Sequence, residues 1–256
     1  MREAIDPPLL NSIARRATLL QEIREENMDK NDLESSLDIS RSTIDRAIRH
    51  LRNENVLDYQ DGKYVLTQYG LLALDAYQNL CEIYKKISEA RPLFQTFDPR
   101  PPLELSEIYN SDIILSKQHA PHAPIDRLEC LLNGCDSIIG FSPVLLPIFQ
   151  QLFYNHIIDK GVETELVLDD NVVKHLLTSS PSEFQEVLEA KHTDVHKTER
   201  TPNYGVIIID EKWVWVGIYD SHGGLKGAIV NNNYSLLEWA TDTIDRFRSQ
   251  GKRVPP

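Results

Sequence analysis

The 256-residue sequence lacks any apolar run that approaches the roughly 20 residues of a membrane-spanning helix. Its beginning, residues 1–8, contains no apolar core of the kind that marks a signal peptide. Cysteine is scarce, since the chain has three: Cys81, Cys130 and Cys135. An odd number of cysteines without a secretory signal favours reduced thiols inside a cell. These absences predict a cytoplasmic protein that does not associate with a membrane.

Convincing metal-binding motifs are also lacking. Three pairs of candidate ligands have suitable spacing: Cys130 with Cys135, His119 with His122, and His192 with His196. The cysteines have no second ligand pair and are better interpreted as small hydrophobic residues. Prolines oppose a helix around the first histidine pair, and the second pair has no clear third ligand. The sequence predicts neither a metal site nor a cofactor.

Basic residues are outnumbered, with 27 Lys and Arg against 39 Asp and Glu and a formal net charge of −12. Residues 1–70 alone hold 10 basic and 13 acidic residues, which leaves them near −3. General electrostatic attraction to DNA is therefore expected to be weak. An acidic surface suits a salt-rich cytoplasm, so a halophilic protein is one hypothesis and a modestly acidic mesophilic protein is the other.

One segment departs from this acidity, because residues 40–53 contain four Arg and one Asp. As a helix, this segment places Ile44, Ala47, Ile48 and Leu51 on one apolar face. Its first residue, a serine, is well suited to be the N-cap. A narrow basic face on an acidic protein indicates a polyanionic partner and predicts a DNA-recognition helix. The candidate DNA contacts on it are Ser40, Arg41, Ser42, Thr43, Asp45, Arg46 and Arg49.

The segments before this helix have the order of a helix-turn-helix. Residues 12–26 predict an amphipathic helix, and Asp29 can cap a second, short helix. Leu33 and Leu37 of the short helix are expected to face inward. A tight turn over residues 37–40 then leads into the basic helix, at the compact spacing of DNA-binding proteins.

A hairpin is predicted after the basic helix. Residues 56–59 and 64–67 are prone to form strands, and the segment between them contains an Asp-Gly pair suited to a hairpin turn. Such a hairpin is a wing, and Lys63 at its tip is placed to touch phosphate. Residues 8–70 are therefore predicted to be a winged helix-turn-helix domain. The alternative is a small helical bundle whose basic helix is merely solvated.

A linker helix is predicted over residues 71–98. Residues 71–94 carry a long apolar stripe, with Gly70 closing the wing and Pro92 at the far end. A helix of this length favours pairing with its twin in a homodimer that binds an inverted-repeat operator in double-stranded DNA. The alternative is that it packs onto its own domain. The irregular segment 97–102 marks a domain boundary near residue 100.

Strand and helix signals alternate over residues 103–250 and predict an α/β effector domain with a mixed sheet. The expected strands are residues 137–141, 164–168, 204–209, 213–219 and 225–230. The expected helices are residues 144–160, 171–178, 182–190 and 234–248. The fold class is α/β overall, with the winged helix-turn-helix at its N-terminal side.

Residues 37–47 resemble haloarchaeal winged-helix transcriptional regulators. The rest of the chain resembles the effector domain that these proteins share with a methanogen regulator of filament formation. The matching pieces are residues 120–124, the strand pair 204–210 and 214–220, and residues 230–232 before Trp239-Ala240. The resemblance covers most of residues 10–248. It implies a dimeric archaeal transcription factor whose C-terminal domain senses an effector.

The effector domain is also similar in layout to the phospholipase D-like fold, which another archaeal regulator family uses as a sugar sensor. The enzymes of that class place a nucleophilic His and a cationic Lys, as His-x-Lys, where this chain has Tyr204-Gly205-Val206. Because the nucleophile and its cationic partner are missing, the sequence predicts a protein that is not an enzyme. A phosphodiesterase is the alternative from the enzyme class.

A small polar effector is predicted to bind between aromatic walls and strand-end polar groups. Trp213 and Trp215 point to one sheet face, where they either wall a pocket or belong to the core. A further alternative is a DNA-binding adaptor whose C-terminal domain recruits a protein and binds no small molecule. The candidate ligand contacts are Ser142, Tyr204, Trp213, Asp220 and Asn231.

Overall fold

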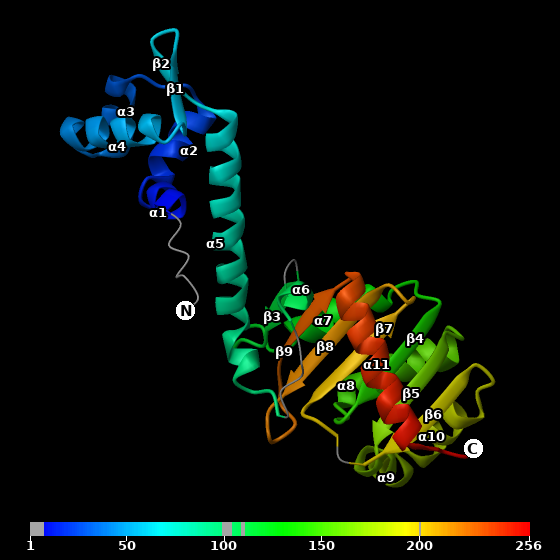
Figure 1. Ribbon diagram of the computed structural model, residues 1–256. Helices are drawn as coiled ribbons and strands as arrows, with labels where there is room; N and C mark the ends of the chain where they lie inside the picture. Colours follow the sequence, from blue (N-terminus) through cyan, green and yellow to red (C-terminus); the bar gives the residue numbers. More distant parts are fainter. Residues whose placement is uncertain (1–7, 99–103, 109–110, 200) are drawn as a thin grey trace, which may run out of the picture. The chain divides into compact units, whose positions relative to one another are not determined.

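The computed structural model describes residues 8–98, 104–108, 111–199 and 201–256. The chain divides into two compact units, which meet between Lys85 and Lys86. The first unit contains α1–α4, β1, β2 and the first part of α5, and the second contains the end of α5 and all later elements (Figure 1). The predicted boundary near residue 100 lies outside the described residues. Within those ranges, no helix is long and apolar enough to cross a membrane.

Two helices, α1 (Pro8–Arg15) and α2 (Ala17–Glu25), occupy the segment for which the sequence predicts one. That prediction is wrong at Arg16. The Arg16 guanidinium donates a hydrogen bond to the Ser12 carbonyl oxygen at 3.2 Å, while its backbone N–H bonds to the Ile13 carbonyl at 3.0 Å. The Arg16 N–H thus bonds to the carbonyl three residues back instead of four, and the regular helix is interrupted there.

The helix-turn-helix consists of α3 (Lys30–Leu37) and α4 (Arg41–Asn53). As predicted, Asp29 caps α3: its carboxylate accepts the backbone N–H groups of Asn31 and Asp32, and the Asp32 carboxylate accepts the Asp29 N–H in return. Asp38 ends α3 in the left-handed region at φ 43°, which turns the chain sharply into α4. The core of this unit includes Leu33.

The wing is a two-stranded antiparallel hairpin of β1 (Leu57–Gln60) and β2 (Lys63–Leu66). Its turn is Asp61-Gly62, with φ angles of 49° and 84°, the conformation that favours Asp-Gly in tight hairpins. An isolated bridge to Met28 extends the pairing on the other side of β2, where the Tyr64 N–H donates to the Met28 carbonyl at 2.8 Å.

The long helix α5 (Gln68–Phe94) begins earlier than the predicted residue 71. Gly70 does not close the wing but lies in the first turn of α5, where a Cβ would stand 2.1 Å from the Val56 carbonyl oxygen. This close approach therefore requires glycine. The helix contributes to both units, since Leu74 packs in the core of the first and Leu93 in the core of the second.

The second unit is built on a mixed eight-stranded sheet in the order β10-β6-β5-β4-β7-β8-β9-β3 (Figure 1). The strands β4, β5 and β6 are parallel, and the other neighbours are antiparallel, so the predicted mixed sheet is confirmed. The strands are β3 (Asp112–Leu115), β4 (Ser137–Ser142), β5 (Glu163–Asp169), β6 (Thr193–Thr198), β7 (Tyr204–Ile209), β8 (Trp213–Tyr219), β9 (Leu225–Asn231) and β10 (Lys252–Arg253).

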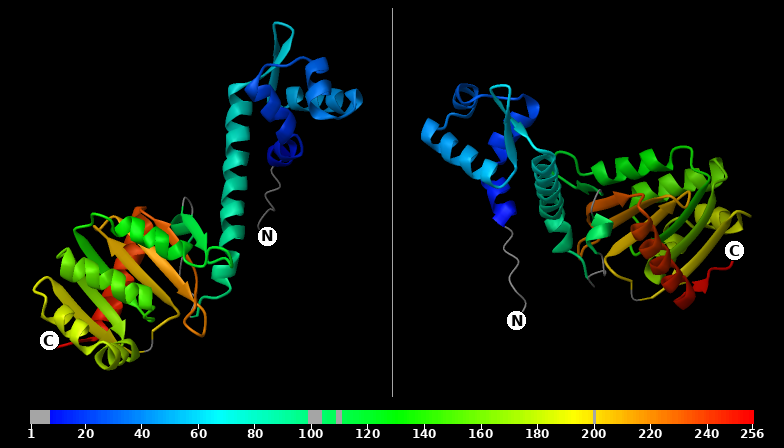
Figure 2. Two further views of the ribbon diagram at one scale, coloured as in Figure 1. Left: turned by 180° about the vertical axis from the view of Figure 1, so that it is seen from behind. Right: turned by 45° about the horizontal axis from the view of Figure 1, so that its top comes forward.

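Helices cover both faces of this sheet. One face carries α11, and the opposite face, which Figure 2 shows from behind, carries α7 and α8. The helix predicted over residues 144–160 is shorter than expected and ends in a π-helical turn, and α7, β3 and β6 were absent from the sequence prediction. The helices are α6 (Leu105–Ile108), α7 (Ala123–Leu132), α8 (Pro147–Tyr154) with the π-helical turn (Asn155–Asp159), α9 (Asp170–Ser179), α10 (Pro181–Glu189) and α11 (Tyr234–Gln250).

Alternation along the central strands separates two cores. Val206 and Val216 belong to the cluster that packs against α11, and their neighbours Ile207 and Trp215 belong to the cluster under α7 and α8. All four side chains are buried. The sheet is therefore apolar on both faces, which explains why its central strands appear in the sequence as continuous hydrophobic runs.

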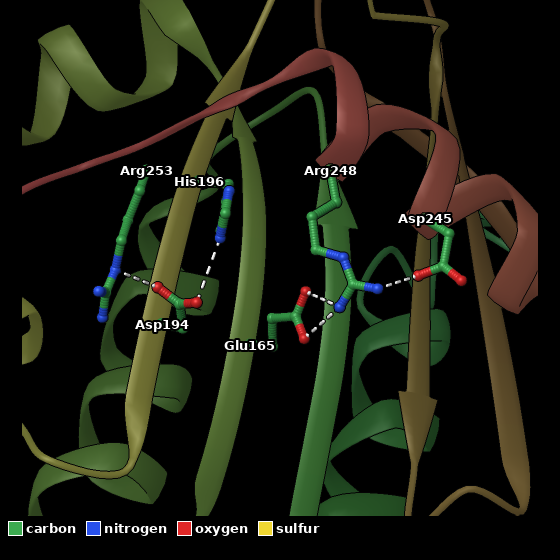
Figure 3. A network of polar contacts seen from close by, with 6 residues as sticks. All are labelled: Glu165, Asp194, His196, Asp245, Arg248 and Arg253. Carbon is green, nitrogen blue, oxygen red and sulfur yellow. Dashed lines mark hydrogen bonds and ion pairs between the residues drawn. The ribbon is translucent and has the colours of Figure 1, made fainter.

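Ion pairs fasten the C-terminal segment to the sheet (Figure 3). Arg248 of α11 donates to both carboxylate oxygens of Glu165 on β5, at 2.7 and 2.8 Å, and contacts Asp245 at 2.5 Å. Asp194 on β6 accepts from Arg253 of β10 at 2.8 Å and lies 3.2 Å from the His196 imidazole. The first set of contacts holds the end of α11, and the second holds the short strand β10.

Candidate nucleic-acid interface

The helix α4 has one buried and one exposed face, as its sequence predicts. Ile44, Ile48 and Leu51 are between 0% and 4% exposed and enter the core of the first unit. Arg46 and Arg49 are exposed on the other side. Among the described residues, neither guanidinium has an ion pair or hydrogen bond, so both remain available to a partner. A pair of free guanidinium groups on a rigid helix is suited to contact phosphates or guanine edges.

The N-terminus of α4 carries a small cluster of hydroxyl groups. Ser40 occupies the predicted N-cap position in extended conformation, but its side chain does not accept a backbone N–H. The Ser40 Oγ instead lies 3.1 Å from the Ser42 Oγ and 2.9 Å from the Thr43 Oγ1. The expected cap bond is thus absent because neighbouring hydroxyls compete for it. Arg41 is exposed beside this cluster, at the end of the helix where the partial charge is positive.

Asp45 is engaged within the protein. Lys30, at the start of α3, contacts the Asp45 carboxylate at 2.5 Å. The hydrogen bond from Lys30 is the main reason why the pKa of Asp45 is lowered, and the pKa of Lys30 is raised in return. The prediction placed Asp45 among the DNA contacts, but the structure gives it a partner that links α3 to α4. Its place among the DNA contacts stays a prediction.

The wing presents Lys63 to solvent at the first position of β2, directly after the turn. Lys63 also acts on Asp29, whose pKa is lowered mainly by the backbone N–H groups of Asp32 and Asn31 and to a smaller extent by Lys63. Tyr59, 49% exposed, packs against Tyr64 with the ring centroids 4.9 Å apart and the rings tilted by 51°, and this cross-strand pair lies close to the turn of the hairpin.

Two further basic residues, Lys30 and Arg52, lie near the predicted DNA contacts of α4 and the wing but are not among them. A polar hollow between α4 and the wing is lined by Lys30 and Arg52, together with Arg49. Arg52 is one of the four arginines in the basic segment 40–53, so the sequence could have predicted it as a contact. Lys30 has no such signal, because only the fold brings the start of α3 beside α4.

The five predicted ligand contacts do not form one site. Ser142 ends β4, Tyr204 begins β7, and Asp220 follows β8, all at one end of the sheet. Trp213 and Asn231 lie at the opposite end, where Asn231 pairs with the residue after Trp213. The prediction of a single pocket is therefore wrong. Because β7, β8 and β9 pair antiparallel, the C-terminal ends of successive strands lie at opposite ends of the sheet.

The polar members of this set serve the fold. Asn231 is buried and donates to the Ser111 Oγ at 3.0 Å. Asp220 accepts the backbone N–H groups of Gly224 and His222 at 2.9 Å and pairs with Lys226 at 3.0 Å. The bonds from Gly224, Lys226 and His222 lower the pKa of Asp220 to about 2. Both side chains are committed to turns and strand ends.

Tyr204 and Val206, at the positions where phospholipase D enzymes carry His and Lys, are buried in the core beneath α11. The Tyr204 ring lies 5.7 Å from Phe97 and 6.0 Å from Trp239. Burial raises the pKa of Tyr204, although a hydrogen bond with Arg246 of α11 opposes the rise. The tyrosine thus does have a cation beside it, contrary to the expectation from sequence, because that cation comes from a distant element.

Comparison with family models assigns both parts of the chain. Residues 121–250 match the model described as the middle domain of the methanogenesis regulatory protein FilR1, and residues 6–89 match the HVO_A0261 N-terminal domain. The first match spans half of the chain. The chain therefore belongs to the FilR1 middle-domain family, and the resemblance to archaeal regulators that its sequence suggests is confirmed.

Individual relatives are more distant. Methanogenesis regulatory protein FilR1 of Methanothrix harundinacea (strain 6Ac) is 21% identical over 240 residues, which are 89% of this chain and 53% of the relative. The chain thus spans about half the length of this curated relative. That relative is named a regulatory protein.

Two solved structures are similar at low identity. TrmBL2, titled an archaeal chromatin protein, is 13% identical with a TM-score of 0.44, and the match covers 95% of this chain and 94% of that one. NucT from Helicobacter pylori is 13% identical with a TM-score of 0.42, over 57% of this chain and 99% of that one. At these scores neither likeness decides the fold or the activity.

Proposed function

We propose that this member of the FilR1 middle-domain family is a sequence-specific DNA-binding transcriptional regulator. The observation that carries the proposal is the exposed face of α4, on which neither Arg46 nor Arg49 has an ion pair or a side-chain hydrogen bond among the described residues. A capped helix-turn-helix holds this face rigidly beside a wing that carries Lys63. The proposed contacts are Arg46 and Arg49 to bases, and Arg41, the hydroxyl cluster and Lys63 to phosphates.

We further propose that the regulator is a homodimer joined through α5. Large apolar side chains remain exposed along this helix: Tyr84 is 64% exposed and Ile87 is 38% exposed. Leu80 and Ile83 lie on the same stripe of the helix and are half-buried. A second α5 packed along this stripe would remove these groups from water. Such a dimer would recognise an inverted repeat with half-sites about one helical turn apart.

Control by a small molecule bound to the second unit completes the proposal. A ligand can change DNA affinity only if it prefers one of two arrangements of the protein, and only by the size of that preference. The alternative is an adaptor that recruits a protein. An apolar cavity in the second unit, described below, favours the small molecule, since protein partners generally need an exposed apolar patch.

The experiment is a selection of bound duplexes from a random DNA pool with the full chain, followed by sequencing. An inverted-repeat motif is expected with the wild type. The double variant Arg46→Ala/Arg49→Ala should give no motif. The control Arg15→Ala/Lys212→Ala removes the same charge from two exposed positions and should recover it. Recovery of unrelated sequences by the wild type at moderate salt would contradict the proposal.

A further inference from the structure

An apolar cavity of about 80 Å³ lies in the second unit, between the sheet and the helices α8 and α10. Its floor includes Leu166 and Ile207 from the sheet, and its roof includes Phe153, Ile157 and Phe184. Apolar cavities in proteins are generally dry, and one of roughly 150 Å³ accepts benzene. At about half that size, this cavity suits a short alkyl chain and is too apolar for the polar effector that the sequence suggests.

The roof of the cavity is conformationally unusual. Residues Asn155–Asp159 form a π-helical turn directly after α8, and Ile157 at its centre faces the cavity. The turn is fixed by the buried His156, whose ring nitrogens lie 2.7 Å from the Leu152 carbonyl and 3.1 Å from the Leu132 carbonyl. Short π-helical turns occur frequently at functional sites because they displace side chains from the regular helical positions.

Polar side chains mark the rim. The Gln150 amide donates to Ser180 Oγ at 2.7 Å and to Glu183 Oε2 at 3.0 Å, and the Tyr154 hydroxyl donates to Glu186 at 2.5 Å. These bonds join α8 to α10. Glu183 and Glu186 have no ion pair within the part of the chain that the structure describes. The rim therefore repels a carboxylate and accepts a hydrogen-bond donor.

We propose that this cavity binds the short alkyl chain of a neutral or cationic amphiphile, an alcohol or an amine, whose polar end lies at the rim of Gln150, Tyr154 and Glu183. The alkyl chain replaces empty space next to Phe153 and Ile157, and the polar end donates to the rim carboxylate. Binding itself does not depend on the DNA-binding role. Its effect on DNA affinity rests on the proposed function.

The test uses butan-1-ol, butylammonium and butanoate as probes of four carbons each, titrated into the full chain at fixed salt and followed by NMR. Butan-1-ol and butylammonium should bind at least 10-fold more tightly than butanoate. Leu176→Phe narrows the cavity, because Leu176 lines it, and should weaken butan-1-ol at least 10-fold. Leu177→Phe is the matched control. Leu177 is the next residue in the chain, and because its side chain is 49% exposed, this variant should bind butan-1-ol like the wild type.

Glu183→Gln provides a test that leaves the apolar walls intact, in case Leu176→Phe does not fold. It should bring the butanoate affinity to within about 3-fold of the butan-1-ol affinity by removing the rim charge. Equal binding of all three probes by the wild type, or equal butan-1-ol affinity in folded Leu176→Phe and Leu177→Phe, would overturn the cavity proposal. Probe binding by a chain that selects no DNA motif would remove the DNA-binding role and support the cavity.

Discussion

Replacing Arg46 with Ala tests whether α4 reads bases. Arg46 is exposed and has no intramolecular partner among the described residues, so its removal breaks no contact that holds the fold. Surface substitutions of this kind change stability by less than about 0.5 kcal/mol. The melting temperature should therefore stay within experimental scatter, and any change in DNA affinity should be a lost contact with DNA.

The size of the loss follows from the type of contact. A bidentate contact from Arg to guanine contributes on the order of 1–3 kcal/mol, which corresponds to a loss of about 5-fold to 150-fold in each half-site. A dimer loses this contact in both half-sites, so the loss of binding free energy doubles. The loss should be concentrated on the selected operator, because a contact with a base edge has no equivalent on a scrambled duplex.

The assay is fluorescence anisotropy on the selected operator and on a scrambled duplex of equal length, at one salt concentration. Arg15→Ala is the control, since Arg15 is exposed on the first unit and its replacement removes the same charge. The control should weaken both duplexes slightly and equally. If Arg46→Ala weakens both duplexes by the same factor, Arg46 contacts only phosphate and the assignment of base recognition is refuted.

Three other predictions test separate parts of the molecule. Lys63→Ala should weaken operator and scrambled DNA alike and reduce the slope of log affinity against log salt by about 0.9 per half-site; an unchanged slope would remove Lys63 from the interface. Leu80→Asp/Ile83→Asp should give monomers by light scattering, because charges enter the apolar stripe, and persistent dimers would place the interface elsewhere. Ion pairs with two lysines lower the pKa of Asp170 to about 2, so Asp170 stabilises the fold above about pH 4 and loses this effect as the pH falls through 2. The difference in melting temperature between wild type and Asp170→Asn should therefore shrink as the pH falls below about 4 and vanish only below about pH 2; a constant difference would contradict it.

The N-terminal unit could be predicted closely from sequence because its signals are local. Asp29 caps α3 by accepting backbone N–H groups two and three residues further along the chain, and Asp61-Gly62 fixes the turn of the hairpin. Each of these features acts within one turn of chain. The interruption at Arg16 was missed because only the backbone bond from the Arg16 N–H to the Ile13 carbonyl sets it, and no glycine or proline marks the position.

Elements of the second unit were missed where local signals mislead. The prolines argued against a helix at His119 and His122, and the helix α7 begins only after them, at Ala123. It was missed because Pro124 lies in its first turn, where a helix needs no backbone N–H from that residue, and was not interpreted as the start of a helix. The strand β6 has the sequence Thr193-Asp-Val-His-Lys-Thr198, which is largely polar and resembles a surface loop. Its pairing with β5 and β10 supplies the backbone hydrogen bonds that make it a strand.

The ligand site shows the limit of sequence reasoning most clearly. Polar residues at strand ends were favoured as ligand contacts because a polar effector was expected, yet Asp220 and Asn231 are occupied by the backbone and side chains around them. The cavity is lined instead by residues such as Phe153 and Ile207, which in a sequence are indistinguishable from core. A cavity wall and a packed core have the same composition, and they differ only in whether facing side chains meet. That difference depends on the π-helical turn and on the spacing of α8 from the sheet, neither of which has a local sequence signal.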